Sequence, residues 1–151
     1  MIFISHRGNL DGPNHSRENS PHYIEECLRL GFHCEIDLRM KNGVPHLGHD
    51  TPDYPVDAEW LRDSRLWIHV KEYDALKWLR ENCPTAKYFC HESDRYTLVS
   101  NGMVWSHDLT NDMNHFCVIP LLSREDVHSY KQTGFGAVCS DYIYDCVKRF
   151  S

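Results

Sequence analysis

Short apolar runs alternate with amphipathic helical patterns along most of this chain, and this alternation restricts its fold more than any other feature. The expected strands cover residues 2–6, 33–40, 44–50, 65–71, 87–93, 102–108, 116–122 and 136–143. The expected helices cover residues 21–31, 73–84 and 123–136, with a short helix after the last strand. Strand–helix–strand order is typical of an α/β protein with a parallel sheet or barrel.

The length of 151 residues predicts a single domain, 1–151, that is long enough to bury a core. A complete (β/α) barrel of the TIM type takes about 250 residues. Several connections here are too short for a full helix, so we expect a compact, trimmed (β/α) TIM-type barrel. Asn42-Gly43 predicts a β-hairpin after the second strand, because such residues accept the positive φ of a tight turn. Sheet left without helices favours self-association, and we therefore expect a homodimer.

The composition argues against several classes of partner. The formal net charge is -6 and no basic stripe stands out, so we expect no nucleic-acid partner. No apolar run approaches the roughly 18 residues of a membrane span, and the first residues follow a buried-strand pattern rather than that of a signal peptide. The 7 cysteines form no CxxC pair, which favours free thiols in a reducing compartment over a disulfide framework, and we expect a cytoplasmic protein.

Two acidic residues, Glu35 and Asp37, stand late in the second expected strand. Period-two geometry places them on one face of that strand, and the carboxyl ends of strands form the working face in such folds. Two carboxylates this close repel each other unless a cation, an arginine or a lysine lies between them. A surface strand with scattered acids is the alternative, but the residues at 34, 36 and 38 make the opposite face apolar.

Basic and imidazole side chains stand at neighbouring strand ends. His6-Arg7 ends the first strand, His49-Asp50 follows the hairpin, and Lys71 ends the strand over 65–71. A histidine beside an arginine and near two carboxylates suits an anion whose leaving group needs a proton. Each element alone is weak, and a solvated lysine is the ordinary explanation of Lys71.

Taken together, these pieces match one family in order and spacing. The elements are His6-Arg7-Gly8, Glu18-Asn19, Glu35-x-Asp37, Asn42-Gly43 and His49-Asp50. They resemble the N-terminal signature of the glycerophosphodiester phosphodiesterases, which belong to the phosphatidylinositol-phosphodiesterase-like barrel superfamily. "IHVK" and "AVCSDYI" look like the family's next strand and its last strand. The signature covers roughly the first third of the chain, and residues 72–136 match only in their βα rhythm.

The resemblance implies roles for several of these residues. His6 and His49 would be the general acid and base, and Arg7 and Lys71 would hold the substrate phosphate. Glu35 and Asp37 would ligate a divalent cation, Mg²⁺ or Ca²⁺, which polarises the phosphoryl oxygens. Three further residues would support the site: Glu18, Asn19 and Asp50.

One residue departs from the family pattern. His69 stands where the family usually has a further glutamate ligand, two residues before the lysine. Imidazole is a poor ligand for Mg²⁺ or Ca²⁺ and a better one for Mn²⁺ or Zn²⁺. The preferred metal has therefore shifted, or water or Glu92 completes the ligand shell, or the affinity is weak and the activity residual.

Six further residues have two interpretations each. The pairs His91-Glu92 and His107-Asp108 follow apolar runs, and either line the pocket or face solvent. Trp105 and Tyr142 either wall the pocket or belong to the core.

The function expected from the sequence is metal-dependent hydrolysis of a small, soluble, glycerophosphodiester-like phosphodiester to a phosphomonoester and an alcohol. A lyase route through a cyclic phosphate would use the same histidines. A non-catalytic module of the same descent, which binds a phosphate ligand or a metal, is the alternative from a different class. Another metal-dependent barrel enzyme, such as a sugar-phosphate isomerase or hydrolase, fits the motifs less well.

Overall fold

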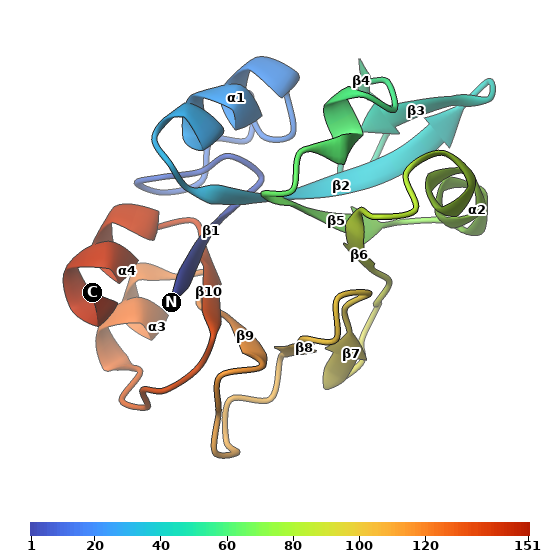
Figure 1. Cartoon of the computed structure of the whole chain (residues 1–151). Coiled ribbons are helices and arrows are strands. Elements are labelled where there is room, and N and C mark those ends of the chain that lie inside the picture. The colour runs from blue at the N-terminus through green and yellow to red at the C-terminus, as the bar shows by residue number, and fades with distance from the viewer.

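A computed structural model describes residues 1–151 and arranges ten strands in one curled sheet (Figure 1). The strands are β1 (Ile2–His6), β2 (His33–Lys41), β3 (Val44–Leu47), β4 (Tyr54–Pro55), β5 (Leu66–Val70), β6 (Lys87–Phe89), β7 (Tyr96–Leu98), β8 (Val104–Ser106), β9 (Cys117–Pro120) and β10 (Ala137–Ser140). The helices are α1 (Pro21–Arg29), α2 (Tyr73–Asn82), α3 (Arg124–Ser129), α4 (Ile143–Phe150) and the short 3-10 turn η1 (Trp60–Arg62).

Strand β1 lies at the centre of the sheet, with parallel neighbours on both sides. On one side β2, β5 and β6 follow in parallel, and on the other side β10, β9 and β8 do. β7 then pairs antiparallel with β8, while β3 and β4 extend β2 as an antiparallel ribbon. The predicted α/β class with parallel pairing is therefore confirmed.

The curl brings β6 close to β7 and β8 without joining them into a continuous barrel, because β6 pairs with β5 alone. No helix connects β6 to the next strand, and the chain forms β7, which pairs antiparallel with β8. β8 therefore does not pair with β6 as the next parallel strand of a barrel would. At this seam the Ser100 amide donates to the Tyr88 carbonyl at 2.9 Å, and the Tyr88 amide donates to Ser100 Oγ at 3.0 Å. The sheet is thus curled like a barrel but not closed, which corrects the expected TIM-type barrel in this respect.

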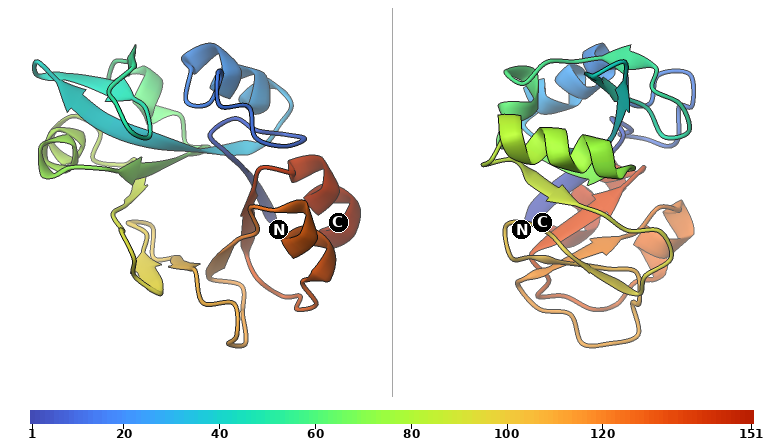
Figure 2. Two further views of the ribbon diagram at one scale, coloured as in Figure 1. Left: turned by 180° about the vertical axis from the view of Figure 1, so that it is seen from behind. Right: turned by 90° about the vertical axis from the view of Figure 1, so that its right-hand side faces the viewer.

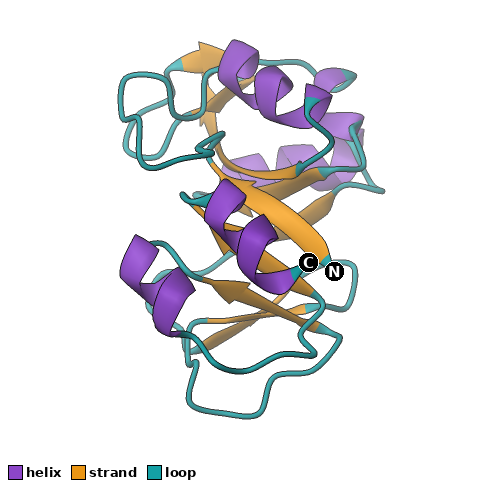
Figure 3. Ribbon diagram, turned by 90° about the vertical axis from the view of Figure 1, so that its left-hand side faces the viewer, coloured by secondary structure: helices purple, strands orange, loops and turns teal.

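The helices cover only part of the outer face of the sheet (Figures 2 and 3). α1 and α2 pack on β2 and β5, around buried residues such as Ile36 and Leu79. α4 packs on β1 and β10, and α3 packs against α4, around residues such as Val138 and Ile143. No helix lies between α2 and α3, where Leu98 is exposed. Part of the helical layer is therefore missing, as the short connections predict, whereas the homodimer remains a prediction.

A third group of buried residues fills the inside of the curl. Ile4, Trp67, Trp105, Val118 and Ala137 meet there from five strands. They occupy the levels below the carboxyl ends of the strands, because Ile4 precedes His6 on β1 and Trp67 precedes His69 on β5 by one period of the pleat. The polar side chains of the next level therefore lie above these apolar residues, at the carboxyl ends of the strands.

Local signals predict some elements well and others poorly. The Asn42-Gly43 turn joins β2 and β3 with φ of 52° and 75°, as the hairpin prediction requires. α3 ends at Ser129, although its pattern suggests a helix to residue 136, since Tyr130 is extended. The last strand ends at Ser140 and not at 143, because Ile143 already begins α4.

The cysteines carry free thiols, and every one except Cys90 is buried. None of the helices combines the length and apolar character that spanning a membrane requires.

A half-buried imidazole makes the stability of the fold depend on pH. Trp67 Nε1 donates to His33 Nδ1 at 3.0 Å, so His33 accepts there as a neutral ring. Burial, and then the positive charge of Lys87, lower the pKa of His33 to about 4. The unfolded chain has the ordinary histidine pKa of about 6.5, so this stabilisation is present above pH 6.5 and is lost as the pH falls toward 4.

We therefore expect His33→Asn, which keeps an acceptor for Trp67, to reduce the loss of Tm between pH 7 and pH 5. Solvent screening of the half-buried ring limits the effect to about 1 kcal/mol, or about 3 °C. Thermal unfolding at the two pH values measures it, with the exposed His128→Asn as control. An equal fall of Tm in wild type and His33→Asn would contradict this assignment.

Candidate functional site

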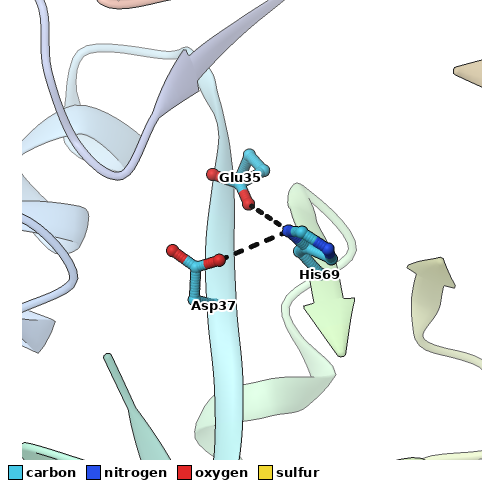
Figure 4. A group of neighbouring side chains, drawn as sticks. All are labelled: Glu35, Asp37 and His69. Atoms are coloured by element: carbon cyan, nitrogen blue, oxygen red, sulfur yellow. Dashed lines mark ion pairs between the residues drawn. The ribbon is translucent and has the colours of Figure 1, made fainter. Parts of the chain in front are cut away.

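Strand register brings two acids and one histidine together. Asp37 on β2 lies directly opposite His69 on β5, and Glu35 precedes Asp37 by one period of the pleat. Asp37 Oδ1 lies 3.3 Å and Glu35 Oε1 lies 3.8 Å from His69 Nδ1 (Figure 4). One ligand atom from each residue falls within 4.8 Å of the others. Atoms that share one cation at about 2.1 Å lie about 3 to 4 Å apart, so the two distances to His69 Nδ1 fit a common ion.

The two carboxylates are buried and incompletely paired. Glu35 is 2% exposed and Asp37 is 0% exposed, while Glu35 Oε2 and Asp37 Oδ1 have no hydrogen-bond partner. Burial, followed by the charge of Asp37, raises the pKa of Glu35. Burial also opposes ionisation of Asp37, but the proximity of His69, the charge of Arg7 and a hydrogen bond from Asn19 outweigh it and lower its pKa. A cation fits between such groups, because it would pair the orphaned oxygens.

The hydrogen bonding of His69 leaves its other nitrogen able to ligate a metal. His69 Nε2 lies 3.1 Å from the carbonyl oxygen of His91, which can only accept, so Nε2 donates. In the neutral ring Nδ1 then carries a lone pair, and it faces Glu35 and Asp37. Metal-binding histidines commonly donate their second N–H to a carbonyl in this way. The donor set is mixed N/O, which suits Mn²⁺ or Zn²⁺ better than Mg²⁺ or Ca²⁺.

The loop after β1 is locked onto β2 by polar side chains. Asn19 Nδ2 donates to Asp37 Oδ2 and Asn19 Oδ1 accepts from the Asp37 amide, both at 2.9 Å. Arg7 Nε lies 2.9 Å from Asp37 Oδ2, and Arg7 Nη1 lies 3.5 Å from Glu18 Oε2. Lys71 Nζ approaches Asp37 Oδ1 from the other side at 3.8 Å. Asn19 and Glu18 thus brace the site, and two cations flank the acids.

His6 is held by an aspartate to which the sequence gives no role. Its Nδ1 lies 2.8 Å from Asp141 Oδ1, and its Nε2 lies 3.8 Å from Glu35 Oε2. Buried Asn9 donates to the same Asp141 oxygen at 2.7 Å and to Glu18 at 2.9 Å. Burial opposes protonation of His6, but the Asp141 hydrogen bond and the Glu35 charge outweigh it and raise the pKa of His6.

His49 lies beyond the hairpin and is partly exposed. Arg39 Nη2 donates to the His49 carbonyl at 2.6 Å, and Arg39 Nε donates to the Gly48 carbonyl at 3.2 Å. Arg39 also lies 3.6 Å from Glu72, so it ties the His49 segment to β2 and to the start of α2. The His49 ring is oriented by Asp50, whose Oδ1 lies 2.8 Å from Nδ1.

One cavity of about 880 Å³ collects most of the predicted residues. Those that line it are His6, Arg7, Glu35, His49, His69 and Lys71. Asp37 does not line the cavity, but it contacts the lining residues Arg7, His69 and Lys71. Glu18, Asn19 and Asp50 also lie outside the lining, and they support the site through hydrogen bonds. The lining residues Arg39 and Glu72 are not predicted from the sequence, because no motif contains them.

The remaining predicted positions divide between the cavity and the surface. The lining includes His91, Glu92, His107 and Trp105, whereas Asp108 pairs with an arginine. Burial lowers the pKa of His91 to about 4 and also lowers that of His107, so both rings are uncharged at neutral pH. Tyr142 lies outside the cavity lining, under the guanidinium of an arginine on α3 at 4.8 Å.

Neither protein-family models, nor curated proteins, nor solved structures include a match to this chain. The glycerophosphodiester phosphodiesterase resemblance therefore stays a prediction from the motifs, and the function is argued from the site.

Proposed function

We propose that this protein is a metal-dependent phosphodiesterase that hydrolyses a glycerophosphodiester-like substrate to a phosphomonoester and an alcohol. The observation that carries the proposal is the group Glu35, Asp37 and His69, whose ligand atoms converge around two buried, unpartnered carboxylate oxygens. His6 lies 3.8 Å from this group, at the wall of the same cavity. Metal ligands, cations and imidazoles in one cavity are what phosphodiester hydrolysis needs.

The chain's own residues would divide the work as follows. Arg7 and Lys71 neutralise the phosphate and hold it beside the acids. A water oxygen attacks phosphorus, and the ester P–O bond breaks. One of His6 and His49 takes the proton from the water, and the other gives a proton to the leaving alkoxide. Asp141 fixes the orientation of His6 through Nδ1, which leaves Nε2 free for the transfer.

Glu35, Asp37 and His69 would hold the divalent cation, which supplies polarisation of the phosphoryl oxygens when it is bound. The mixed donor set supports Mn²⁺ or Zn²⁺ as the preferred ion.

Replacing His69 with glutamate is expected to change the metal preference. The change restores a third carboxylate, so Mg²⁺ or Ca²⁺ should gain relative to Mn²⁺ by about tenfold in the concentration that gives half-maximal turnover. Metal titrations of turnover and of Tm in the wild type and in His69→Glu measure this shift. The control is His22→Glu, an exposed histidine on α1. An unchanged order of metals in His69→Glu would remove His69 from the ligand set.

The proposed acid–base pair is tested by His6→Ala and His49→Ala. Each is expected to lower turnover by about a hundredfold or more while the protein stays folded, because general acid–base catalysis contributes 10²–10⁴-fold. Retained turnover in both would exclude this pair. A protein with no turnover that is stabilised by glycerol phosphate, and loses this stabilisation in Arg7→Ala, would be a binding module instead.

A further inference from the structure

The cavity wall at the β6–β8 seam is built from stacked aromatic rings. The Trp105 and Phe89 centroids lie 4.4 Å apart, and those of Phe89 and His69 lie 4.9 Å apart. One level higher, His91 and His107 stack at 4.1 Å. The interplanar angles of these three stacks are 21°, 10° and 27°. These five rings all line the cavity, and two of the stacks bridge the seam where β6 has no strand partner on the β7–β8 side.

Stacking covers faces of these rings, and the edges of Phe89, Trp105, His91 and His107 remain for a ligand, whereas His69 turns its edge nitrogens to the acids and to the His91 carbonyl. His69 and Phe89 are register partners on adjacent parallel strands, so both rings project inward side by side. An aromatic ring carries negative potential on its face and positive potential at its edge. Edges therefore attract the face of another ring, whereas a quaternary ammonium group prefers ring faces.

Charge is distributed unevenly around the cavity. The lining cations are Arg7 directly after β1, Arg39 on β2 and Lys71 directly after β5. β8 and β9 lie across the curl from β2 and β5 (Figure 1), and the lining continues there with Pro120 and Leu122. A phosphate at the cations thus directs its alcohol substituent toward aromatic and apolar side chains.

Two carboxylates also line the cavity near this wall. Glu92 and Asp94 stand on the loop after β6, and both are exposed to solvent. These carboxylates would favour an alcohol substituent with a positive charge, whereas the covered ring faces oppose one. The carboxylates thus predict that a cationic phosphate monoester binds best, and the ring edges predict that an aromatic one does.

We propose that the alcohol substituent of the substrate carries an aromatic ring, which rests face-on against the ring edges of this wall. The inference rests on the proposed function, since the same site must hold the phosphate.

Calorimetric titration of the Mn²⁺-loaded protein with four phosphate monoesters tests the inference without requiring turnover. Phenyl phosphate is the aromatic probe, cyclohexyl phosphate matches its size, methyl phosphate lacks a ring, and phosphocholine is cationic. We expect phenyl phosphate to bind about tenfold more tightly than methyl phosphate and several-fold more tightly than cyclohexyl phosphate. Phosphocholine or cyclohexyl phosphate binding as tightly as phenyl phosphate, or no binding of any probe, overturns the inference.

Substitutions in the wall provide the second arm. Trp105→Leu and His107→Leu should each lower the ratio of phenyl to cyclohexyl affinity toward one, and the exposed Phe116→Leu should leave it unchanged. His107 is exposed, so its variant keeps the test valid where loss of the buried Trp105 prevents folding. An unchanged ratio in His107→Leu overturns the inference.

The two proposals can fail separately. Selective binding of phenyl phosphate by a protein that hydrolyses no diester would refute the proposed function and leave the aromatic subsite. Turnover of diesters by a protein that binds phenyl and cyclohexyl phosphate equally would refute the subsite alone.

Discussion

Replacing Asp37 with asparagine is expected to destabilise the metal-free protein, whereas replacing Glu35 with glutamine is expected to leave it as stable or make it more so. Asp37 balances the charge of Arg7 and accepts a hydrogen bond from Asn19. Breaking such a buried pair costs about 3–5 kcal/mol, or roughly 10 °C in Tm. Both carboxylates keep one buried oxygen without a hydrogen-bond partner, but neither arginine nor asparagine pairs with Glu35, and burial raises its pKa, so its charge is a cost in the absence of a metal.

Unfolding in EDTA measures both effects, with the exposed Asp112→Asn as control. In the presence of Mn²⁺ or Zn²⁺ the wild type should gain stability, and both variants should lose most of that gain because each removes one ligand charge. In EDTA the two substitutions should change Tm in opposite directions, and with metal both should lose the gain in Tm. This combination would show that Asp37 also stabilises the fold, whereas Glu35 serves only to bind a cation. Equal destabilisation by the two substitutions would contradict this assignment.

Gly48→Ala is expected to displace His49 from its position in the cavity wall and so to reduce turnover. Gly48 has φ of 151°, and a Cβ atom at this residue would lie 1.9 Å from the Thr51 carbonyl oxygen. The backbone of the loop would have to move, because that oxygen belongs to the main chain. A residue forced into this region of φ costs about 1–3 kcal/mol, and a displacement of about 1 Å at a catalytic group can reduce the rate a hundredfold.

The matched control is Gly43→Ala in the hairpin turn. Gly43 has φ of 75° and no atom within 4 Å of a built Cβ, so its substitution strains the backbone without a clash. We expect Gly43→Ala to lose about 1 kcal/mol of stability and to keep its turnover within a few-fold of wild type. Turnover and Tm of the two variants, measured side by side, distinguish them. Full turnover in Gly48→Ala would show that the position of His49 does not matter.

The parts of the site that could be predicted from sequence depend on neighbours along the chain. Pleat periodicity is enough to place Glu35 and Asp37 on one face, and turn chemistry is enough to place the hairpin at Asn42-Gly43. The carboxyl-end rule for parallel strands then brings His6 and Lys71 to the same end of the sheet. These arguments need no knowledge of long-range contacts.

The parts that could not be predicted depend on contacts between distant residues. His6 and Asp141 are separated by 135 positions, and no local pattern pairs them. The donor state of His69 depends on the carbonyl of His91, 22 positions away, which the sequence places in a strand over 87–93 and the structure places in the loop after β6. The open seam arises because β7 pairs with β8 rather than β6, and short strands of similar composition do not specify which neighbour they choose.

The central claim, a metal-dependent phosphodiesterase, is tested most directly by turnover measurements on the purified protein. Hydrolysis of bis-p-nitrophenyl phosphate and of glycerophosphocholine would be followed with Mg²⁺, Ca²⁺, Mn²⁺, Zn²⁺ or EDTA, in the wild type and in His6→Ala. We predict turnover with at least one divalent cation, highest with Mn²⁺ or Zn²⁺, that disappears in EDTA and in His6→Ala. Folded protein with no turnover in any metal, or turnover that persists in EDTA, would contradict the claim.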